Sequence, residues 1–173
     1  MRKSALFALA VTFAWQLGGH TVWAQQKGND KEHAELAKAL KGVNTALEKG
    51  LAASESQGKP ISGKFEVEDG KLQLSVYTMK ADKFSEVIID HKTGKVAKTE
   101  AITDGKDLTA AKAQSEAMAK AKSALRAATE KAVKANKGFR AVSAMPSLKD
   151  GHPVAEITLV KGEEFKTVSE KLD

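Results

Sequence analysis

One set of residues occurs twice in this chain at a constant separation. The second set lies 81 positions after the first (150−69, 165−84 and 168−87): Asp69-Gly70, Phe84 and Val87, then Asp150-Gly151, Phe165 and Val168. A repeated turn followed by the same apolar positions indicates that the same strand face is buried twice. The sequence therefore predicts a duplicated unit, and this prediction concerns the fold before it concerns any chemistry.

A helical segment precedes each copy of the turn. Asn29 and Glu32 have the spacing of a capping box, and a stripe of Leu and Val predicts a helix over 29–54. An alanine-rich stretch predicts a second helix over 109–136, ended by Gly138. The helices repeat at a shift of 82 (125−43 and 133−51), which matches Val43 with Leu125 and Leu51 with Val133.

Alternating apolar residues predict an antiparallel meander after each helix. Asp69-Gly70 and Asp150-Gly151 are strong hairpin signals, because glycine accepts the positive φ of a tight turn. The expected strands are 61–67, 72–76, 84–89 and a short fourth at 95–99 in the first unit, then 142–148, 154–160 and 165–172 in the second. The chain printed here stops at Asp173, so the second unit is expected to be truncated before a fourth strand.

The first 24 residues have the pattern of a secretory signal peptide. Arg2 and Lys3 precede an apolar stretch over 4–17, and Ala24 ends a short segment suited to a signal peptidase. The expected organisation is a signal peptide at 1–24, a first unit at 25–101, a linker at 102–108 and a second unit at 109–173. Cysteine is absent, which excludes a lipid-anchored lipoprotein and any disulfide. A bacterial periplasmic or secreted location fits best, with no membrane span after cleavage.

The charge pattern does not indicate a nucleic-acid partner. The formal net charge of +6 falls to +4 without Arg2 and Lys3, since residues 1–24 hold no Asp or Glu. Lysine and glutamate alternate along the remainder instead of forming basic clusters. This is the pattern of a solvated surface.

The residues of common catalytic and metal sites are also missing. No serine lies in a Gly-x-Ser-x-Gly motif, and no histidine pair has a metal-binding spacing. His91 and His152 both fall at hairpin turns, so whether they converge in space is left open. The sequence predicts a protein without enzymatic activity, cofactor or metal.

The order of these elements resembles the PepSY domain family. The shared features are a helix, an Asp-Gly hairpin and a final strand that leads into Asp-x-x-Thr-Gly-Lys-Val, here Asp90, Thr93, Gly94, Lys95 and Val96. The resemblance covers about 35–100 well and 115–173 less well, because the second unit lacks the Thr-Gly turn. It implies an α+β fold, cystatin-like or PepSY-like, with two long helices that are each followed by an antiparallel meander. Asp90, Thr93 and Gly94 are expected to shape a turn.

The resemblance also implies a function in binding. PepSY domains occur in the propeptides of metallopeptidases, and tandem copies are similar in architecture to a β-lactamase inhibitor protein that presents a concave sheet to its enzyme. An envelope or secreted protein, such as a peptidase, is therefore the expected partner, and a small-ligand or metal-ion carrier or sensor is the alternative. A third reading is an architectural role in the envelope, by pairing through the sheet edge that the truncated second unit leaves exposed. The residues expected to face a partner lie on the strands: Lys64, Glu66, Gln73, Ser75 and Tyr77.

Overall fold

The computed structural model describes residues 22–173, with side chains from residue 30 onward, and shows an α+β fold in this part of the chain. Most of the expected signal peptide, residues 1–21, lies outside the described residues. The helices are α1 (Val22–Ala39), α2 (Leu47–Ser54), α3 (Gly105–Lys120) and α4 (Leu125–Ala135). The strands are β1 (Lys59–Glu68), β2 (Lys71–Lys80), β3 (Lys83–Ile89), β4 (Val96–Ile102), β5 (Arg140–Lys149), β6 (His152–Lys161) and β7 (Glu164–Lys171). No helix among these is long and apolar enough to cross a bilayer.

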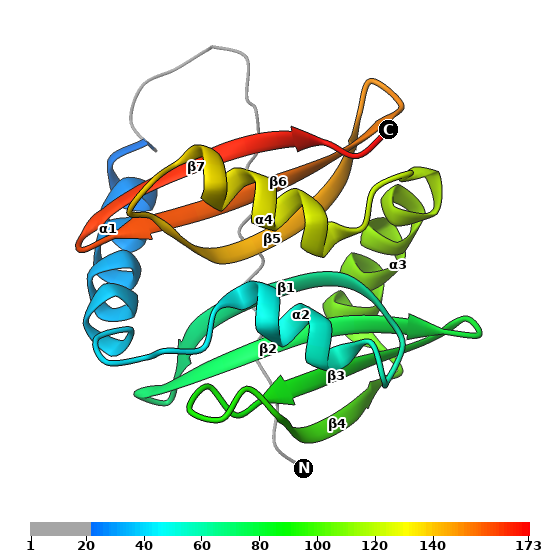
Figure 1. Cartoon of the computed structure of the whole chain (residues 1–173), viewed down its shortest axis with the longest axis horizontal. Helices are drawn as coiled ribbons and strands as arrows, with labels where there is room; N and C mark the ends of the chain where they lie inside the picture. The colour runs from blue at the N-terminus through cyan, green and yellow to red at the C-terminus, as the bar shows by residue number, and fades with distance from the viewer. Residues whose placement is uncertain (1–21) are drawn as a thin grey trace.

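All seven strands belong to one antiparallel sheet. Their order is β4-β3-β2-β1-β5-β6-β7, so the first strands of the two meanders lie side by side in the middle (Figure 1). The sequence left open whether the two halves form one sheet or two lobes, and the answer is one sheet.

The midline of the sheet pairs residues that are 81 positions apart. β1 meets β5 antiparallel, with Gly63 opposite Ala144 (144−63 = 81) and Lys64 opposite Ser143. An antiparallel pair in which a position faces its own counterpart has a local twofold axis through that point. The first half of the sheet, β1 to β4, is thus related to the second half, β5 to β7, by an approximate rotation about the midline.

Irregularities of the backbone follow the same separation. The β1–β2 register shifts between Pro60 and Ser62, and the β5–β6 register shifts between Ala141 and Ser143, again 81 residues later. Both hairpins then close on an Asp-Gly turn with positive φ at both positions. The φ angles are 50° and 74° at Asp69 and Gly70, and 52° and 82° at Asp150 and Gly151.

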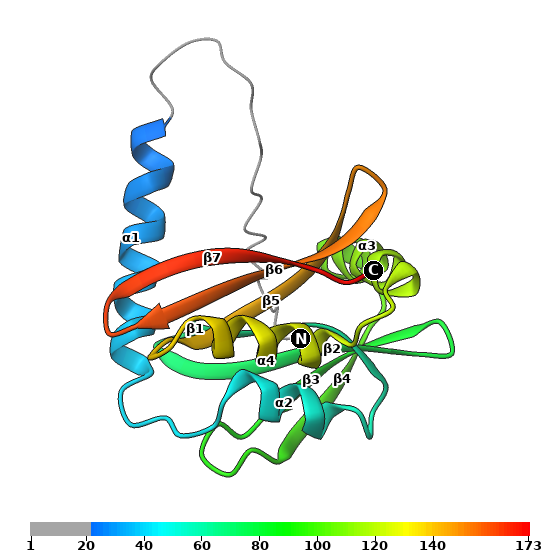
Figure 2. The same ribbon diagram turned by 45° about the horizontal axis from the view of Figure 1, so that its top comes forward.

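The helices cover both faces of the sheet, with α2 and α4 over one face and α1 and α3 over the other (Figure 2). α2 and α4 pack on the face we call the apolar face, where Leu47 and Leu51 approach Gly63 so closely that an added Cβ would lie 3.2–3.3 Å from them. Buried side chains of the strands on this face include Phe65, Leu74, Val76, Val87, Ile89, Ala144 and Ile157. On the opposite face, α3 contacts β1 through Ser62 and Gln114, and α1 contacts β7 through His33 and Phe165.

The prediction of a single helix over 29–54 is wrong, because the structure has two helices there, α1 and α2, and α1 starts earlier than predicted. The helix already begins at Val22, because nothing from Val22 to Lys27 breaks it and the Asn29–Glu32 pattern falls in its interior. It ends at Ala39, and Gly42, with a φ of 80°, turns the chain away before α2 begins at Leu47. This break is stabilised from β5, where the Arg140 guanidinium donates hydrogen bonds of 2.7 Å to the carbonyl oxygens of Val43 and Thr45.

The second predicted helix, 109–136, is also divided. α3 ends at Lys120 and α4 begins at Leu125, and in between the amides of Lys122 and Ser123 donate to the Leu172 carbonyl at 2.7 and 2.9 Å. The expected linker is shorter than 102–108, because Ile102 ends β4 and α3 starts at Gly105. The break in each predicted helix was missed because the residues that bind it, Arg140 and Leu172, are distant in sequence.

A cation from the opposite half of the sheet reaches each helical region. Arg140 of the second half binds the break after α1, and Lys59 of the first half donates from its Nζ to the Met118 carbonyl, in the last turn of α3, at 2.9 Å. The two residues are again 81 positions apart (140−59). The Met118 carbonyl lies at the C-terminal end of α3, where a cation is favourable, whereas Val43 and Thr45 lie in the loop between α1 and α2. Each half of the chain thus binds the helical region of the other.

Candidate binding surface

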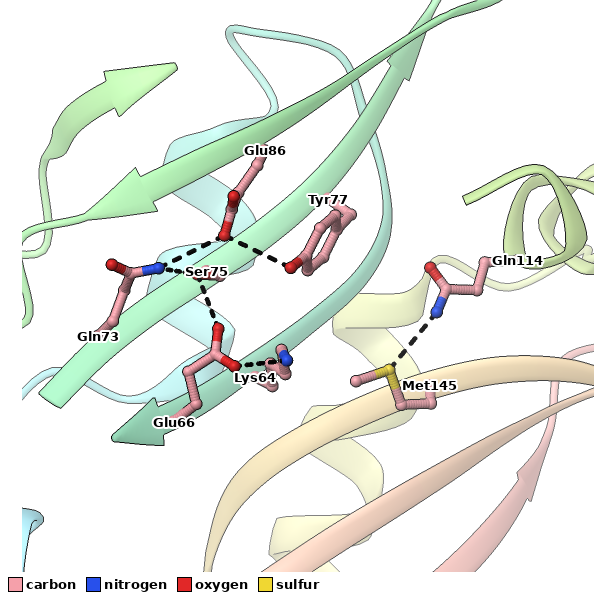
Figure 3. Close-up of polar contacts among 8 residues, drawn as sticks. All are labelled: Lys64, Glu66, Gln73, Ser75, Tyr77, Glu86, Gln114 and Met145. Atoms are coloured by element: carbon pink, nitrogen blue, oxygen red, sulfur yellow. Dashed lines mark hydrogen bonds and ion pairs between the residues drawn. The ribbon is translucent and has the colours of Figure 1, made fainter. Parts of the chain in front are cut away.

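The polar face is the sheet surface opposite α2 and α4, and it carries one connected set of polar side chains in the first half. Side chains alternate along a strand, so positions 64 and 66 of β1, 73, 75 and 77 of β2, and 86 of β3 share this surface. We call this set the polar network: Lys64, Glu66, Gln73, Ser75, Tyr77 and Glu86 (Figure 3).

One end of the polar network is an ion pair on β1. Lys64 Nζ lies 2.5 Å from Glu66 Oε2, and the exposed fractions of the two side chains are 11% and 25%. The Ser75 hydroxyl donates to the other Glu66 oxygen at 3.4 Å. Because both charged groups are mostly shielded from water, their attraction is screened less than that of a surface pair.

The other end of the network centres on the Glu86 carboxyl group. Glu86 Oε1 accepts hydrogen bonds from Tyr77 OH and Gln73 Nε2, each at 3.4 Å, and Gln73 also donates to the Ser75 hydroxyl at 2.9 Å. Glu86 is 8% exposed and Tyr77 is 4% exposed. Burial raises the pKa of Glu86 above its ordinary value, and the nearby charge of Glu66 raises it further.

Tyr77 is a hydrogen-bond donor at every physiological pH. Burial, and then the charge of Glu86, raise the pKa of the Tyr77 phenol far above its usual range. The phenol therefore stays protonated and keeps its hydrogen bond to Glu86.

The helices α1 and α3 lie on the polar face at opposite ends of the molecule (Figure 1). α3 is held by Gln114, whose Oε1 accepts from the Ser62 hydroxyl at 2.6 Å and whose Nε2 lies 3.6 Å from Met145 Sδ. α1 is held by the His33 ring, which stacks on Phe165 with a centroid distance of 4.0 Å. The polar network is therefore flanked by helices that come from both halves of the chain.

All five residues expected to face a partner lie in the polar network. Their exposure differs from the expectation, since Ser75 and Tyr77 are buried and Lys64, Glu66 and Gln73 are half-buried. The sequence reasoning missed Glu86 and Gln114. The alternation of the third strand would have placed Glu86 beside Tyr77, whereas nothing local indicates that Gln114 reaches Ser62.

The turn that carries the PepSY-like motif is well defined. The Asp90 carboxylate accepts from the amides of Lys92 and Thr93 at 2.8 and 3.3 Å, and these hydrogen bonds, that of Lys92 first, lower the pKa of Asp90. Gly94 has a φ of 73°, and its amide donates to the Asp90 carbonyl at 2.7 Å. All of these bonds are local to the turn, so the three motif residues shape the backbone there.

His91 and His152 do not converge. Successive hairpin turns alternate between the two ends of a meander, and β5 runs antiparallel to β1, so these histidines lie at opposite ends of the sheet. His152 Nδ1 instead lies 2.9 Å from Asp173 Oδ2. Within residues 22–173, no three His, Asp or Glu side chains are grouped as metal ligands.

The fold and the polar network define the class of this protein only as an α+β protein with a polar sheet surface between two helices. Comparisons with protein-family models, with curated proteins and with solved structures find no match to the chain.

Proposed function

We propose that this protein is an exported, non-catalytic binding module built from two PepSY-like units, which arose by duplication. The constant separation of 81 residues at the midline, the bulges and the hairpin turns supports the duplication. The motif residues Asp90, Thr93 and Gly94 support the family assignment. The pattern of residues 1–24 supports export to the periplasm or the exterior.

The polar network is the proposed binding surface, and its ligand is proposed to be a protein such as a secreted or periplasmic peptidase. The observation that carries this proposal is that charged, amide and hydroxyl groups share one sheet surface between two helices. Half-buried Lys64, Glu66 and Gln73 form the accessible part, and Ser75, Tyr77 and Glu86 hold it in place from below.

A protein ligand fits this network better than an enclosed small molecule or metal ion. Among the described residues, every buried side-chain nitrogen or oxygen atom already has a hydrogen-bond partner. A site that encloses a small polar ligand needs buried groups aimed at that ligand, and here those groups bind each other. The preorganised network instead presents a rigid outer rim, which favours recognition of another surface.

Site-specific photocrosslinking in living cells tests the proposed surface. A crosslinking residue in place of Gln73 should give a covalent adduct with a peptidase or another envelope protein, identified by mass spectrometry. The matched control replaces Lys134, an exposed residue on α4, behind the sheet. Adducts that form equally from both positions, or from the control alone, would contradict the proposal.

Export is tested separately by N-terminal sequencing of the protein from the periplasm or the medium. A mature chain that begins at Gln25 is expected. A cytoplasmic protein that keeps Met1 would refute the export part and leave the binding surface to the crosslinking result.

A further inference from the structure

The outer edge of β7 presents regular strand backbone. β6 and β7 pair without a register shift, from Lys161 opposite Glu164 to Val154 opposite Lys171, and the Leu172 amide continues the ladder by donating to the Pro153 carbonyl at 3.0 Å. Even-numbered residues of β7 therefore direct their backbone groups to β6, and odd-numbered residues direct theirs outward. Within residues 22–173, no strand pairs with that outer side.

The opposite edge of the sheet is different. β4 pairs with β3 through an irregular register, with a shift between Ile88 and Ile89. Irregularities of this kind twist an edge strand and reduce its tendency to pair with another chain. β7 has no register shift. The strand 81 positions earlier, β3, pairs with β4 on the side that corresponds to the outer edge of β7. The edge of β7 is thus the one suited to accept a strand.

The side chains of β7 complement a second copy of β7. The odd-numbered residues of β7 carry the backbone groups that point outward. If two copies of β7 pair antiparallel, the odd-numbered residues of one copy must therefore lie opposite odd-numbered residues of the other. With Val168 opposite Val168, Lys166 faces Glu170 twice, on the side of the sheet where Glu170 also lies 2.7 Å from Lys131 of its own chain. With the axis at Thr167, Glu164 would face Glu170, and with the axis at Ser169, Val168 would face Glu170.

Like charges directly opposite each other are unfavourable and opposite charges are favourable, so one register is selected. In that register Thr167 also faces Ser169, and Phe165 faces the long side chain of Lys171. We propose that β7 pairs antiparallel with β7 of a second copy of this chain, centred on Val168, which joins two sheets into one. This proposal concerns an edge of the sheet and is independent of the polar network.

Proline at position 167 tests the edge directly. The amide of Thr167 points outward, so Thr167→Pro removes no backbone hydrogen bond to β6, and edge strands tolerate proline. Within the chain it removes only the Thr167 hydroxyl, which lies 3.3 Å from Thr158 Oγ1. Sedimentation should show a dimer for the native chain and a monomer for T167P. Thr99→Pro on β4 is the matched control and should leave the dimer intact. A native monomer at millimolar concentration, or a dimer that T167P leaves intact, would overturn the proposal.

Charge reversal tests the register and does not depend on proline. Lys166→Glu and Glu170→Lys should each weaken the dimer at least tenfold, because each sets two pairs of like charges against one another. Glu170→Lys also breaks the ion pair with Lys131 within the chain, so Lys166→Glu is the cleaner of the two single variants. The double variant restores both pairs and should regain most of the affinity. Failure of the double variant to dimerise better than either single variant, while thermal melting shows that all are folded, would refute this register.

A disulfide provides a third measurement, since the chain has no native cysteine. Val168 would lie in a non-hydrogen-bonded pair with a Cα separation of about 4.5 Å, which a disulfide can span. Val168→Cys should therefore crosslink on oxidation. Ser169→Cys, opposite Thr167 in the same register, should not, and the reverse result would contradict the axis at Val168.

Discussion

The two halves of the sheet have matching backbones and different polar faces. The Asp-Gly turns and the bulges agree at a separation of 81 residues. The side chains of the polar network do not: the positions of Lys64, Glu66, Gln73, Ser75, Tyr77 and Glu86 correspond to Met145, Ser147, Val154, Glu156, Thr158 and Thr167. Turns and bulges require particular backbone angles, whereas a partly solvated strand face accepts many residue types. The polar face is therefore the surface on which the two halves of the sheet differ most.

The largest difference in stability between corresponding substitutions should appear in α2 and α4, the helices on the apolar face. Leu51 of α2 is fully buried, whereas its counterpart Val133 of α4 is partly exposed. Leu51→Ala should lower the free energy of unfolding by about 3 kcal/mol, and Val133→Ala by about 1 kcal/mol, because the first leaves a larger cavity. Urea unfolding of both variants measures the difference. Equal losses would show that the two helices contribute equally to the core.

Removing Arg140 or Lys59, the two cations that bind helical regions of the opposite half, should give a smaller difference in stability. Arg140→Ala leaves the carbonyl groups of Val43 and Thr45 without a charged donor and should cost about 2 kcal/mol. Lys59→Ala removes one bond from an exposed residue and should cost about 1 kcal/mol. Hydrogen exchange should locate the effect of the first at 40–46 and of the second near Met118. Unchanged exchange at 40–46 in Arg140→Ala would rule out this role.

Glu86→Gln tests the cost of the buried carboxyl group that only the first half carries. The folded pKa of Glu86 is raised, so the folded protein binds a proton more tightly than the unfolded chain, and stability falls as the pH rises from the unfolded pKa through the folded one. Glu66 and Glu100 are the carboxyl groups that face it. Glu86→Gln should stabilise the protein by about 1 kcal/mol at pH 7. It should also remove the loss of stability that accompanies the rise in pH through the acidic range.

The corresponding position in the second half supplies the control for that experiment. Thr167→Val should leave the slope of stability against pH unchanged, because Thr167 does not titrate. A Glu86→Gln variant that is less stable than the native protein at neutral pH would show that the hydrogen bonds of the carboxylate outweigh its burial.

The smallest effects should come from the second turn of each meander. Ala81 has a φ of 48°, and its counterpart Gly162 has a φ of 62°. A left-handed backbone costs alanine about 1 kcal/mol relative to glycine, so Ala81→Gly should stabilise the first half and Gly162→Ala should destabilise the second. The sizes need not match, because Asp82 also has a positive φ, of 61°, whereas the residue after Gly162 does not. Thermal melting should show shifts of opposite sign. Shifts of the same sign would mean that contacts beyond the backbone control one of the turns.

The sequence was informative where the determinants are local. Alternating apolar residues predicted the strands, and the Asp-Gly pairs predicted the turns now seen at 69–70 and 150–151. Alternation also predicted that Lys64 and Glu66, on one strand, share a face. That the residues of three strands form one network follows from the strand register, which the hairpin turns fix.

The remaining features depend on contacts between distant segments. The divided helices could not be predicted, since Arg140 reaches its two carbonyl groups across more than 90 residues. The burial of Tyr77 likewise depends on how side chains and helices cover the polar face. Sequence periodicity describes which residues share a surface, and it does not describe what lies over that surface.

The narrow midline has a mechanical consequence. Only two residue pairs join β1 to β5, at Gly63 and Lys64, whereas β1 and β2 are joined by nine. Under a pulling force applied between the halves, the sheet should part along this seam first, and the guanidinium and ammonium groups that cross it at Arg140 and Lys59 would act as tethers that yield last.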